Sequence, residues 1–442
     1  MRRNSLLVKR FLNGRWGPQF NSSLPFSLSF SRNAGSAKVA EEEAGYSDGL
    51  ECALAGKGVF VKDKAFRNLN ACELHQHGAT ITQSLSGIPL HMRGNVLEGA
   101  PGISKTQFNK LLKQAYVFVH DGAIGSSPKC DAKVRVISDS PSPLLSLSNV
   151  LWKTPARAIS HDSCPLTVYV ATSMSPGVVG DSIGLGSGGT DGLIAGDIDR
   201  LSLVLCGKAF ADTTGTKEAL SALSGPIIAA RGGLPLSARL LVIGESAVLL
   251  FAPENTIKRC ANKLVSSDTG VVLSSQGVTT LFQGGSYGGS NLFKSPDAVI
   301  FASSYSCGTM PSISKLSPGQ AAYQFLAGYQ NGKFVPAYTK GPSSIDPLEL
   351  AKALLFKLKE DHIPSFLVKA SDGEKSLTGK EFIKLVETTL SKDIPPFQAK
   401  VREYNYDSEC IVAYFFSDSD LQEKYKTFLS RKFPEMPEEL SF

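Results

Sequence analysis

Two kinds of signal follow one another along this chain. Short apolar runs have the length of a β-strand, and capping residues mark the starts of helices. Residues 133–138 (KVRVIS) alternate between two faces, as a β-strand does. Residues 317–320 (SPGQ) combine a capping serine, a proline in the first helical turn and a glutamine three positions after the serine, which predicts a helix start. The longest apolar runs, residues 247–252 and 411–416, have strand length, far below the roughly 18 residues of a membrane helix. The pattern predicts an α/β protein with mixed sheets and no membrane span.

The same reasoning predicts most other elements. Capping residues predict further helices that begin at Ser104, Asp346 and Thr378. Two Gly-rich stretches, residues 177–197 and 284–295, are expected to be linkers. We expect strands over residues 116–120, 133–138, 166–171, 201–207, 297–303 and 410–416, hairpins over 239–252 and 271–282, and helices over 104–115, 217–230 and 421–433.

The positive charge of the chain is concentrated at its start. Residues 1–40 contain seven basic residues and no acidic one, and the first acidic residue is Glu41. This Arg-rich, Ser-rich composition is typical of a transit peptide, and arginines spread among apolar residues favour the mitochondrial matrix over the plastid. The alternative is a disordered basic tail. Beyond residue 40, 39 basic residues face 40 acidic ones, so the body is nearly neutral and a nucleic-acid partner is not expected.

Metal and dinucleotide signals are weak. The eight cysteines include no C-x-x-C pair, which favours reduced thiols over a zinc site or a disulfide framework. His75 and His77 form a lone His-x-His pair without further ligands nearby. Residues 184–189 match the letters of a dinucleotide loop, but a turn follows them where a helix is needed, so a flexible loop is expected there.

Two stretches point to a known family. Residues 116–138 read YVFVHDGAIGSSPKCDAKVRVIS, and residues 297–329 read DAVIFASSYSCGTMPSISKLSPGQAAYQFLAGY. They resemble the ATP-dependent phosphoenolpyruvate carboxykinases of plant and bacterial type, in a strand-loop-strand and in a strand, loop and helix respectively. Their order and spacing also fit that family, and the resemblance covers roughly residues 68–430.

The resemblance implies a two-domain carboxykinase-like fold. Behind a transit peptide (residues 1–40), an N-terminal mixed α/β domain would span residues 41–238 and a nucleotide-binding-type C-terminal domain residues 239–442. The family converts oxaloacetate and ATP into phosphoenolpyruvate, carbon dioxide and ADP in gluconeogenesis. That reaction uses divalent metals (Mn²⁺ or Mg²⁺), an arginine for the substrate carboxylates and a glycine loop for the triphosphate.

The nucleotide loop of that family falls here on residues 251–259 (FAPENTIKR), which contain no glycine. Lys258 stands where the family has its lysine, and Thr256 and Arg259 are the other vestigial nucleotide-binding candidates. The loop works by turning successive backbone N–H groups onto the phosphates, which glycine permits. The resemblance therefore implies a degenerate P-loop.

Three further residues oppose phosphate binding in this segment. Pro253 has no N–H to donate, Ile257 disfavours a positive φ, and Glu254 adds a negative charge beside an anion. Losing three charge-assisted hydrogen bonds costs about 5–9 kcal/mol, which would take a micromolar affinity for ATP to millimolar or weaker.

The other family positions are also altered. Arg93 lies one residue away from the position of the substrate-binding arginine. Lys217 and Asp268 fall near the positions of the metal-binding lysine and aspartate, and Lys315 matches a retained lysine. Arg231 falls where the family has a metal-binding histidine, and a cation there would repel a metal. Arg93, Lys217 and Lys315 are therefore vestigial catalytic candidates, and Asp268 is the one metal candidate.

These substitutions favour a mitochondrial pseudoenzyme, a non-catalytic binding or structural component with protein partners in a mitochondrial assembly and without a bound cofactor. Two alternatives remain open. The first is an active ATP-dependent carboxykinase that uses ATP and Mn²⁺ or Mg²⁺. The second is a degraded site that still binds a nucleotide or another anion. RNA binding in an organelle ribosome is a weaker idea, because the body is nearly neutral.

Overall fold

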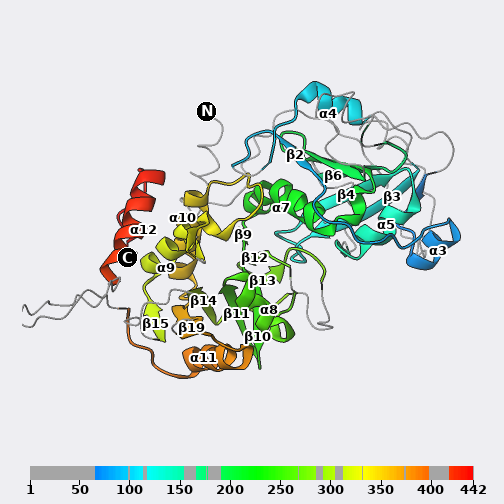
Figure 1. Cartoon of the computed structure of the whole chain (residues 1–442). Coiled ribbons are helices and arrows are strands. Elements are labelled where there is room, and N and C mark those ends of the chain that lie inside the picture. Colours follow the sequence, from blue (N-terminus) through cyan, green and yellow to red (C-terminus); the bar gives the residue numbers. More distant parts are fainter. Residues whose placement is uncertain are drawn as a thin grey trace, which may run out of the picture.

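The computed structural model (Figure 1) describes twelve stretches of the chain. They are residues 65–97, 100–112, 117–153, 166–175, 177, 191–266, 268–284, 292–303, 312–330, 332–372, 375–397 and 418–441. The expected transit peptide and the expected strand over residues 410–416 lie outside them.

The first half of the described chain forms one eight-stranded mixed sheet in the order β1-β3-β4-β6-β8-β7-β2, with β5 pairing β3. Pairing is parallel through β4, β6 and β8, and antiparallel between β3 and β4 and between β7 and β8. The strands are β1 (Phe66–Arg67), β2 (Leu90–Arg93), β3 (Phe118–Ile124), β4 (Ala132–Ser138), β5 (Trp152–Lys153), β6 (Leu166–Ala171), β7 (Gly192–Asp197) and β8 (Ser202–Gly207).

Helices cover both faces of this sheet. On one face, α3 (Ala71–Gln76), α5 (Pro141–Ser148) and α7 (Thr213–Ala230) bury leucines against the alternate residues of β4, β6 and β8. On the other face, α4 (Lys105–Leu111) buries Phe108 and Leu111. Because successive side chains of a strand point to opposite faces of the sheet, the same strands contribute apolar residues to both layers.

The second half contains a five-stranded mixed sheet and a three-stranded antiparallel sheet. The five-stranded sheet has the order β10-β11-β14-β18-β15, and the three-stranded sheet the order β13-β12-β9. The strands are β9 (Leu234–Leu236), β10 (Arg239–Ile243), β11 (Ser246–Phe251), β12 (Val271–Ser274), β13 (Gly277–Thr280), β14 (Ala298–Ser303), β15 (Ile313–Leu316) and β18 (Ser365–Lys369), with two short hairpins, β16 (Tyr329–Gln330) with β17 (Lys333–Phe334) and β19 (Ser371–Asp372) with β20 (Lys375–Ser376).

Two layers of helices also cover the five-stranded sheet. The helices α9 (Pro318–Ala327) and α10 (Pro347–Glu360) pack on one face, and α12 (Asp418–Lys432) packs against α9. The short helix α8 (Glu254–Arg259) and α11 (Gly379–Ser391) pack on the other face. In Figure 1, α7 lies between the two groups of strands.

The predicted caps are confirmed. Ser104, Ser317 and Thr378 each accept a hydrogen bond from the backbone N–H three residues on, in a full capping box, and Asp346 caps α10. At the other end of α9, Gly328 adopts the left-handed conformation with φ of 58°. A Cβ on Gly328 would overlap the carbonyl oxygen of Val335, so this turn requires glycine.

The structure confirms an α/β chain with mixed sheets and both expected hairpins. Some predicted bounds were wrong. Helix α4 ends at Leu111 rather than near residue 115, and β3 extends to Ile124 rather than ending at residue 120. Among the residues that the structure describes, no helix is both long and apolar enough to cross a bilayer.

The expectation of a linker over residues 177–197 was wrong for its last part, because residues 192–197 form the buried strand β7. Its glycines allow close packing. A Cβ on Gly192 would lie 2.8 Å from the backbone nitrogen of Ala209, and one on Gly196 would lie 2.5 Å from the sulfur of Met92. Glycine is found both in flexible loops and at tight contacts between strands and their neighbours, so a Gly-rich stretch does not distinguish the two.

The two halves are joined through strand pairing. Strand β9 directly follows α7 in the sequence, yet it pairs with β12 in the second half rather than with the eight-stranded sheet. A boundary at residue 238 therefore falls between β9 and the strand with which it pairs. This arrangement places α7 beside the second half, and a cavity opens along the helix.

Candidate functional site

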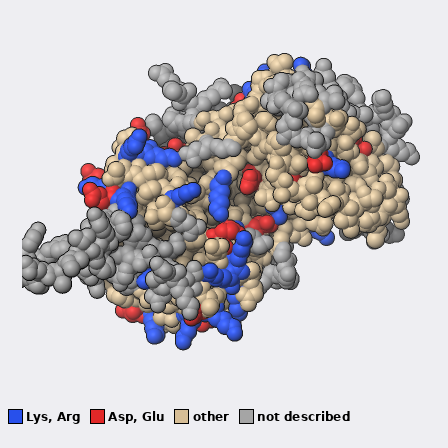
Figure 2. Space-filling model, viewed as in Figure 1, with Lys and Arg blue, Asp and Glu red and all other residues tan. Residues whose placement is uncertain are grey.

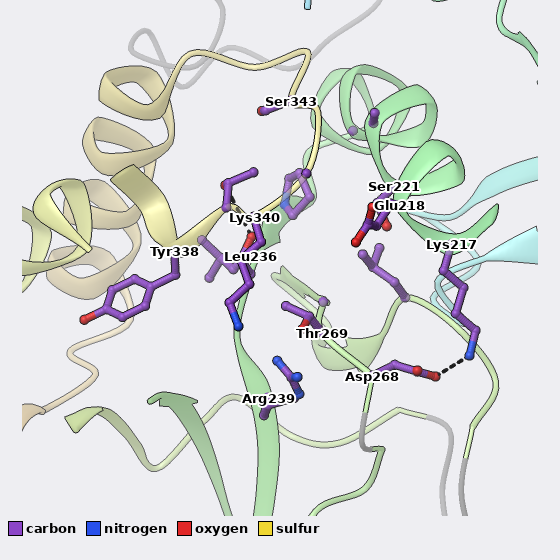
Figure 3. Close-up of a pocket in the computed structure, with 18 of the residues that line it drawn as sticks. Lys217, Glu218, Ser221, Leu236, Arg239, Asp268, Thr269, Tyr338, Lys340 and Ser343 are labelled. Atoms are coloured by element: carbon purple, nitrogen blue, oxygen red, sulfur yellow. Dashed lines mark hydrogen bonds and ion pairs between the residues drawn. The ribbon is translucent and has the colours of Figure 1, made fainter. Parts of the chain in front are cut away.

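A cavity of about 410 Å³ lies where α7, the sheet strands β9 and β10, helix α8 and the segment 338–345 meet (Figure 3). Figure 2 shows the same region as a hollow between the two halves, with basic and acidic side chains around it. Hydroxyl groups and apolar side chains form much of the wall. The charged residues that line it are Lys217, Glu218, Arg239, Glu254, Asp268 and Lys340.

The first turns of α7 bring two charged side chains to this cavity. Asp212 begins the helix, and its carboxylate accepts hydrogen bonds from the backbone N–H groups of Gly215 and Ile88. With the helix start fixed in this way, Lys217 and Glu218 lie one turn further along and line the cavity.

Lys217 is bound by an acidic side chain from the second half of the chain. Its Nζ lies 2.7 Å from Oδ2 of Asp268, the dashed contact in Figure 3. The ammonium group also lies 6.0 Å from the ring centroid of Phe282, within range of a cation–π interaction. The structure thus brings together two predicted site residues as partners in one ion pair.

The carboxylate of Glu254 forms ion pairs with two cations from separate parts of the chain. Its Oε2 lies 3.6 Å from the guanidinium of Arg239 on β10 and 3.4 Å from Nζ of Lys340. The side chain of Arg239 is only 11% exposed, and burial lowers the pKa of its guanidinium, while Glu254 and then Asp268 oppose that shift. The carboxylate of Glu254 therefore partly balances both cations.

Glu218 is the remaining acid of the cavity. Desolvation raises the pKa of its carboxyl group, and the negative charge of Asp212 adds to the effect. Within the described part of the chain, Glu218 takes part in neither an ion pair nor a hydrogen bond. Its charge is consequently the least compensated in the cavity.

The segment predicted to be a degenerate nucleotide loop is mostly helical. Strand β11 ends at Phe251, and α8 begins at Glu254 with Pro253 as its N-cap, which makes no side-chain capping bond. Ile257 lines the cavity together with Glu254. The six-residue helix thus begins with a carboxylate at the end where an anion would be stabilised.

The three vestigial nucleotide-binding candidates lie on this helix but do not line the cavity. Thr256 is buried, whereas Lys258 and Arg259 are exposed. Arg259 donates a hydrogen bond to the carbonyl oxygen of Leu377, at 3.0 Å. A shared nucleotide site built from these three side chains has no support in this arrangement.

The structure places the other candidates elsewhere. Arg93 on β2 pairs at 2.7 Å with the fully buried Asp197. Lys315 is an exposed residue of β15. Arg231 lies 3.3 Å from the buried Asp131. None of these cations is among the residues that line the cavity, and each of the two arginines is paired with a buried carboxylate.

Two of the three carboxylates that line the cavity are engaged by cations. Asp268 is held by Lys217 and Glu254 by two cations, and among the described residues His, Cys, Asp and Glu form no group of three that could hold a metal ion. The sequence reasoning missed Arg239 and Lys340, because neither lies in a motif and only the fold brings them to Glu254.

No protein-family model matches the chain, and no curated protein matches it significantly in sequence. The carboxykinase resemblance therefore remains a hypothesis that rests on the residues quoted above.

Proposed function

We propose that this chain is a mitochondrial carboxykinase-like pseudoenzyme, a non-catalytic binding or structural component of a larger protein assembly. The proposal rests on the resemblance of residues 116–138 and 297–329 to the carboxykinase family, and on the transit-peptide composition of residues 1–40. It does not include catalysis, since the residues at the family's nucleotide position oppose phosphate binding.

The observation that carries the proposal is the start of helix α8. Pro253 and Glu254 form the start of this helix, and the family resemblance aligns them with the loop that presents backbone N–H groups in a P-loop. Glu254 then pairs with Arg239 and Lys340, two cavity cations that could otherwise attract a phosphate. An internal carboxylate at this point competes with any anionic substrate.

An activity assay tests the loss of catalysis. The purified full chain is mixed with oxaloacetate, ATP and Mn²⁺, and ADP is measured against a sample without oxaloacetate. We expect no oxaloacetate-dependent ADP formation. Turnover that disappears in Lys258→Ala would overturn the proposal in favour of an active carboxykinase.

A separation by size tests the assembly. In a native gel of mitochondrial extract, the chain is expected to migrate with a high-mass complex rather than alone. Migration as a free monomer, in an extract whose other complexes stay intact, would contradict the structural role.

A further inference from the structure

Helices α8 and α11 meet at the surface. Arg259 donates to the carbonyl oxygen of Leu377, just before α11 begins. A Cβ on Gly379 would overlap the carbonyl oxygen of Arg259, so the two helix ends are in direct backbone contact. Side chains that project outward from both helices therefore share one face of the molecule.

Five basic residues, on α8, on the short 3₁₀ turn that follows it (Ala261–Lys263) and on α11, are together called the α8–α11 basic face. All five are exposed, and Figure 2 shows basic side chains gathered over the region where α8 and α11 lie in Figure 1. The residues are Lys258, Arg259, Lys263, Lys380 and Lys384.

These cations are not balanced from within the described chain, where none of the five forms an ion pair. Lys380 and Lys384 are one helical turn apart and point away from the buried Phe382 and Val386. The exposed acids of α11, Glu381 and Glu387, offset part of this charge, so five cations face two carboxylates. The face thus holds a local excess of positive charge on a body that is otherwise nearly neutral.

The chemistry of the face favours an acidic protein segment over RNA. Helix α8 has no aromatic residue, and the aromatic residue of α11, Phe382, is buried, so there is no platform for base stacking. The exposed Glu387 also lies on α11, and it would repel an evenly charged phosphate backbone. A protein segment can place its acids opposite the lysines and avoid Glu387.

We propose that the α8–α11 basic face docks an acidic segment of a protein partner. The proposal rests on the proposed function, in which the chain is a component of an assembly, and this face would be its contact with another component. Lys258 is then a docking residue rather than a remnant of a nucleotide site.

The test measures binding of a fluorescent ten-residue polyglutamate peptide to the full chain by anisotropy, at low salt. We expect binding that weakens about tenfold in the variant Lys258→Glu, Lys263→Glu, Lys380→Glu and Lys384→Glu, because four exposed ion pairs that are individually weak are lost together. A matched control carries the same charge change on exposed lysines of the first half. It combines Lys105→Glu, Lys110→Glu, Lys129→Glu and Lys153→Glu.

Three results would overturn the inference. They are no binding of polyglutamate at low salt, equal weakening in the control variant, and tighter binding of a ten-residue polyuridine RNA through the same four lysines. Circular dichroism checks the fold of both variants. If the α8–α11 variant unfolds, the set with glutamine at the same four positions replaces it, and unchanged polyglutamate binding in that set would also overturn the inference. A chain that binds polyglutamate yet forms oxaloacetate-dependent ADP would refute the proposed function alone.

Discussion

Lys217 and Asp268, 51 positions apart in the sequence, meet in an ion pair of 2.7 Å on the wall of the cavity. The pair joins α7 to the segment before β12, and both side chains are mostly shielded, at 20% and 29% exposure. The carboxykinase resemblance would assign both side chains to metal binding, but here each is the charge partner of the other.

A double-mutant cycle tests this pair. Lys217→Met, Asp268→Asn and the double variant should give a coupling free energy of about 0.5–1 kcal/mol, which is the range for pairs with some solvent screening. Urea denaturation provides the free energies of unfolding. A coupling energy near zero would mean that the two side chains are not paired in solution.

Replacing Glu254 should create an anion site. In Glu254→Gln, the cavity keeps Arg239 and Lys340 but loses their shared carboxylate. We expect inorganic pyrophosphate to bind about tenfold more tightly than to the unmodified chain, since charge-assisted hydrogen bonds to two cations become possible. Titration calorimetry measures the affinity.

Glu218→Gln is the matched control for that experiment, because it removes a cavity acid that forms an ion pair with neither cation. Equal gains of pyrophosphate affinity in both variants would show that only the net charge of the cavity matters. No gain in Glu254→Gln would refute the role of Glu254 as an internal anion.

The turn after α9 should not tolerate a side chain. Gly328→Ala would combine a positive φ with an overlap against the carbonyl oxygen of Val335. We expect a loss of unfolding free energy above about 2 kcal/mol. Gly332→Ala is the control, since Gly332 has a similar φ of 78° but nothing within 4 Å of its Cβ position, and its cost should be about 1 kcal/mol.

Stability should fall in mild acid because of His120. Desolvation lowers the pKa of this side chain, although Asp121 opposes the shift, and its buried Nδ1 has no hydrogen-bond partner among the described residues. The unfolded chain takes up a proton near pH 6.5, whereas the folded chain does so only at lower pH. Acidification through that window therefore favours unfolding.

Urea midpoints at pH 7, 6 and 5 measure this effect, and His120→Gln should reduce the slope. His91 contributes in the same direction, because burial also lowers its pKa, so the double variant with His91→Gln should be flatter still. A slope that is identical in the original chain and in both variants would contradict the assignment.

The sequence predicted the elements whose signals are local. Ser104, Ser317 and Thr378 each lie three residues from the side chain that completes their capping box, so a short window of sequence contains the whole interaction. The hairpin of β10 and β11 was predictable for the same reason. Strand β7 was not, because its glycines are required by Ala209 and Met92, which are distant in sequence.

The cavity depends on longer-range contacts. Lys340 meets Glu254 across 86 positions of sequence, and no spacing rule connects two such residues. Lys217 and Asp268 were singled out by the family resemblance alone, and their contact with each other was not foreseen. Periodicity and capping can predict the elements, but the cavity follows from how the two halves pack.

Only Ala252 and Pro253 separate strand β11 from helix α8. A turn that wraps a phosphate needs several consecutive backbone N–H groups, and this connection offers one, from Ala252. Point substitutions cannot lengthen it, and untwisting α8 would withdraw Ile257 from the core. A phosphate-binding loop at this position would therefore require inserted residues. Loss of such a loop is harder to reverse than loss of a single side chain.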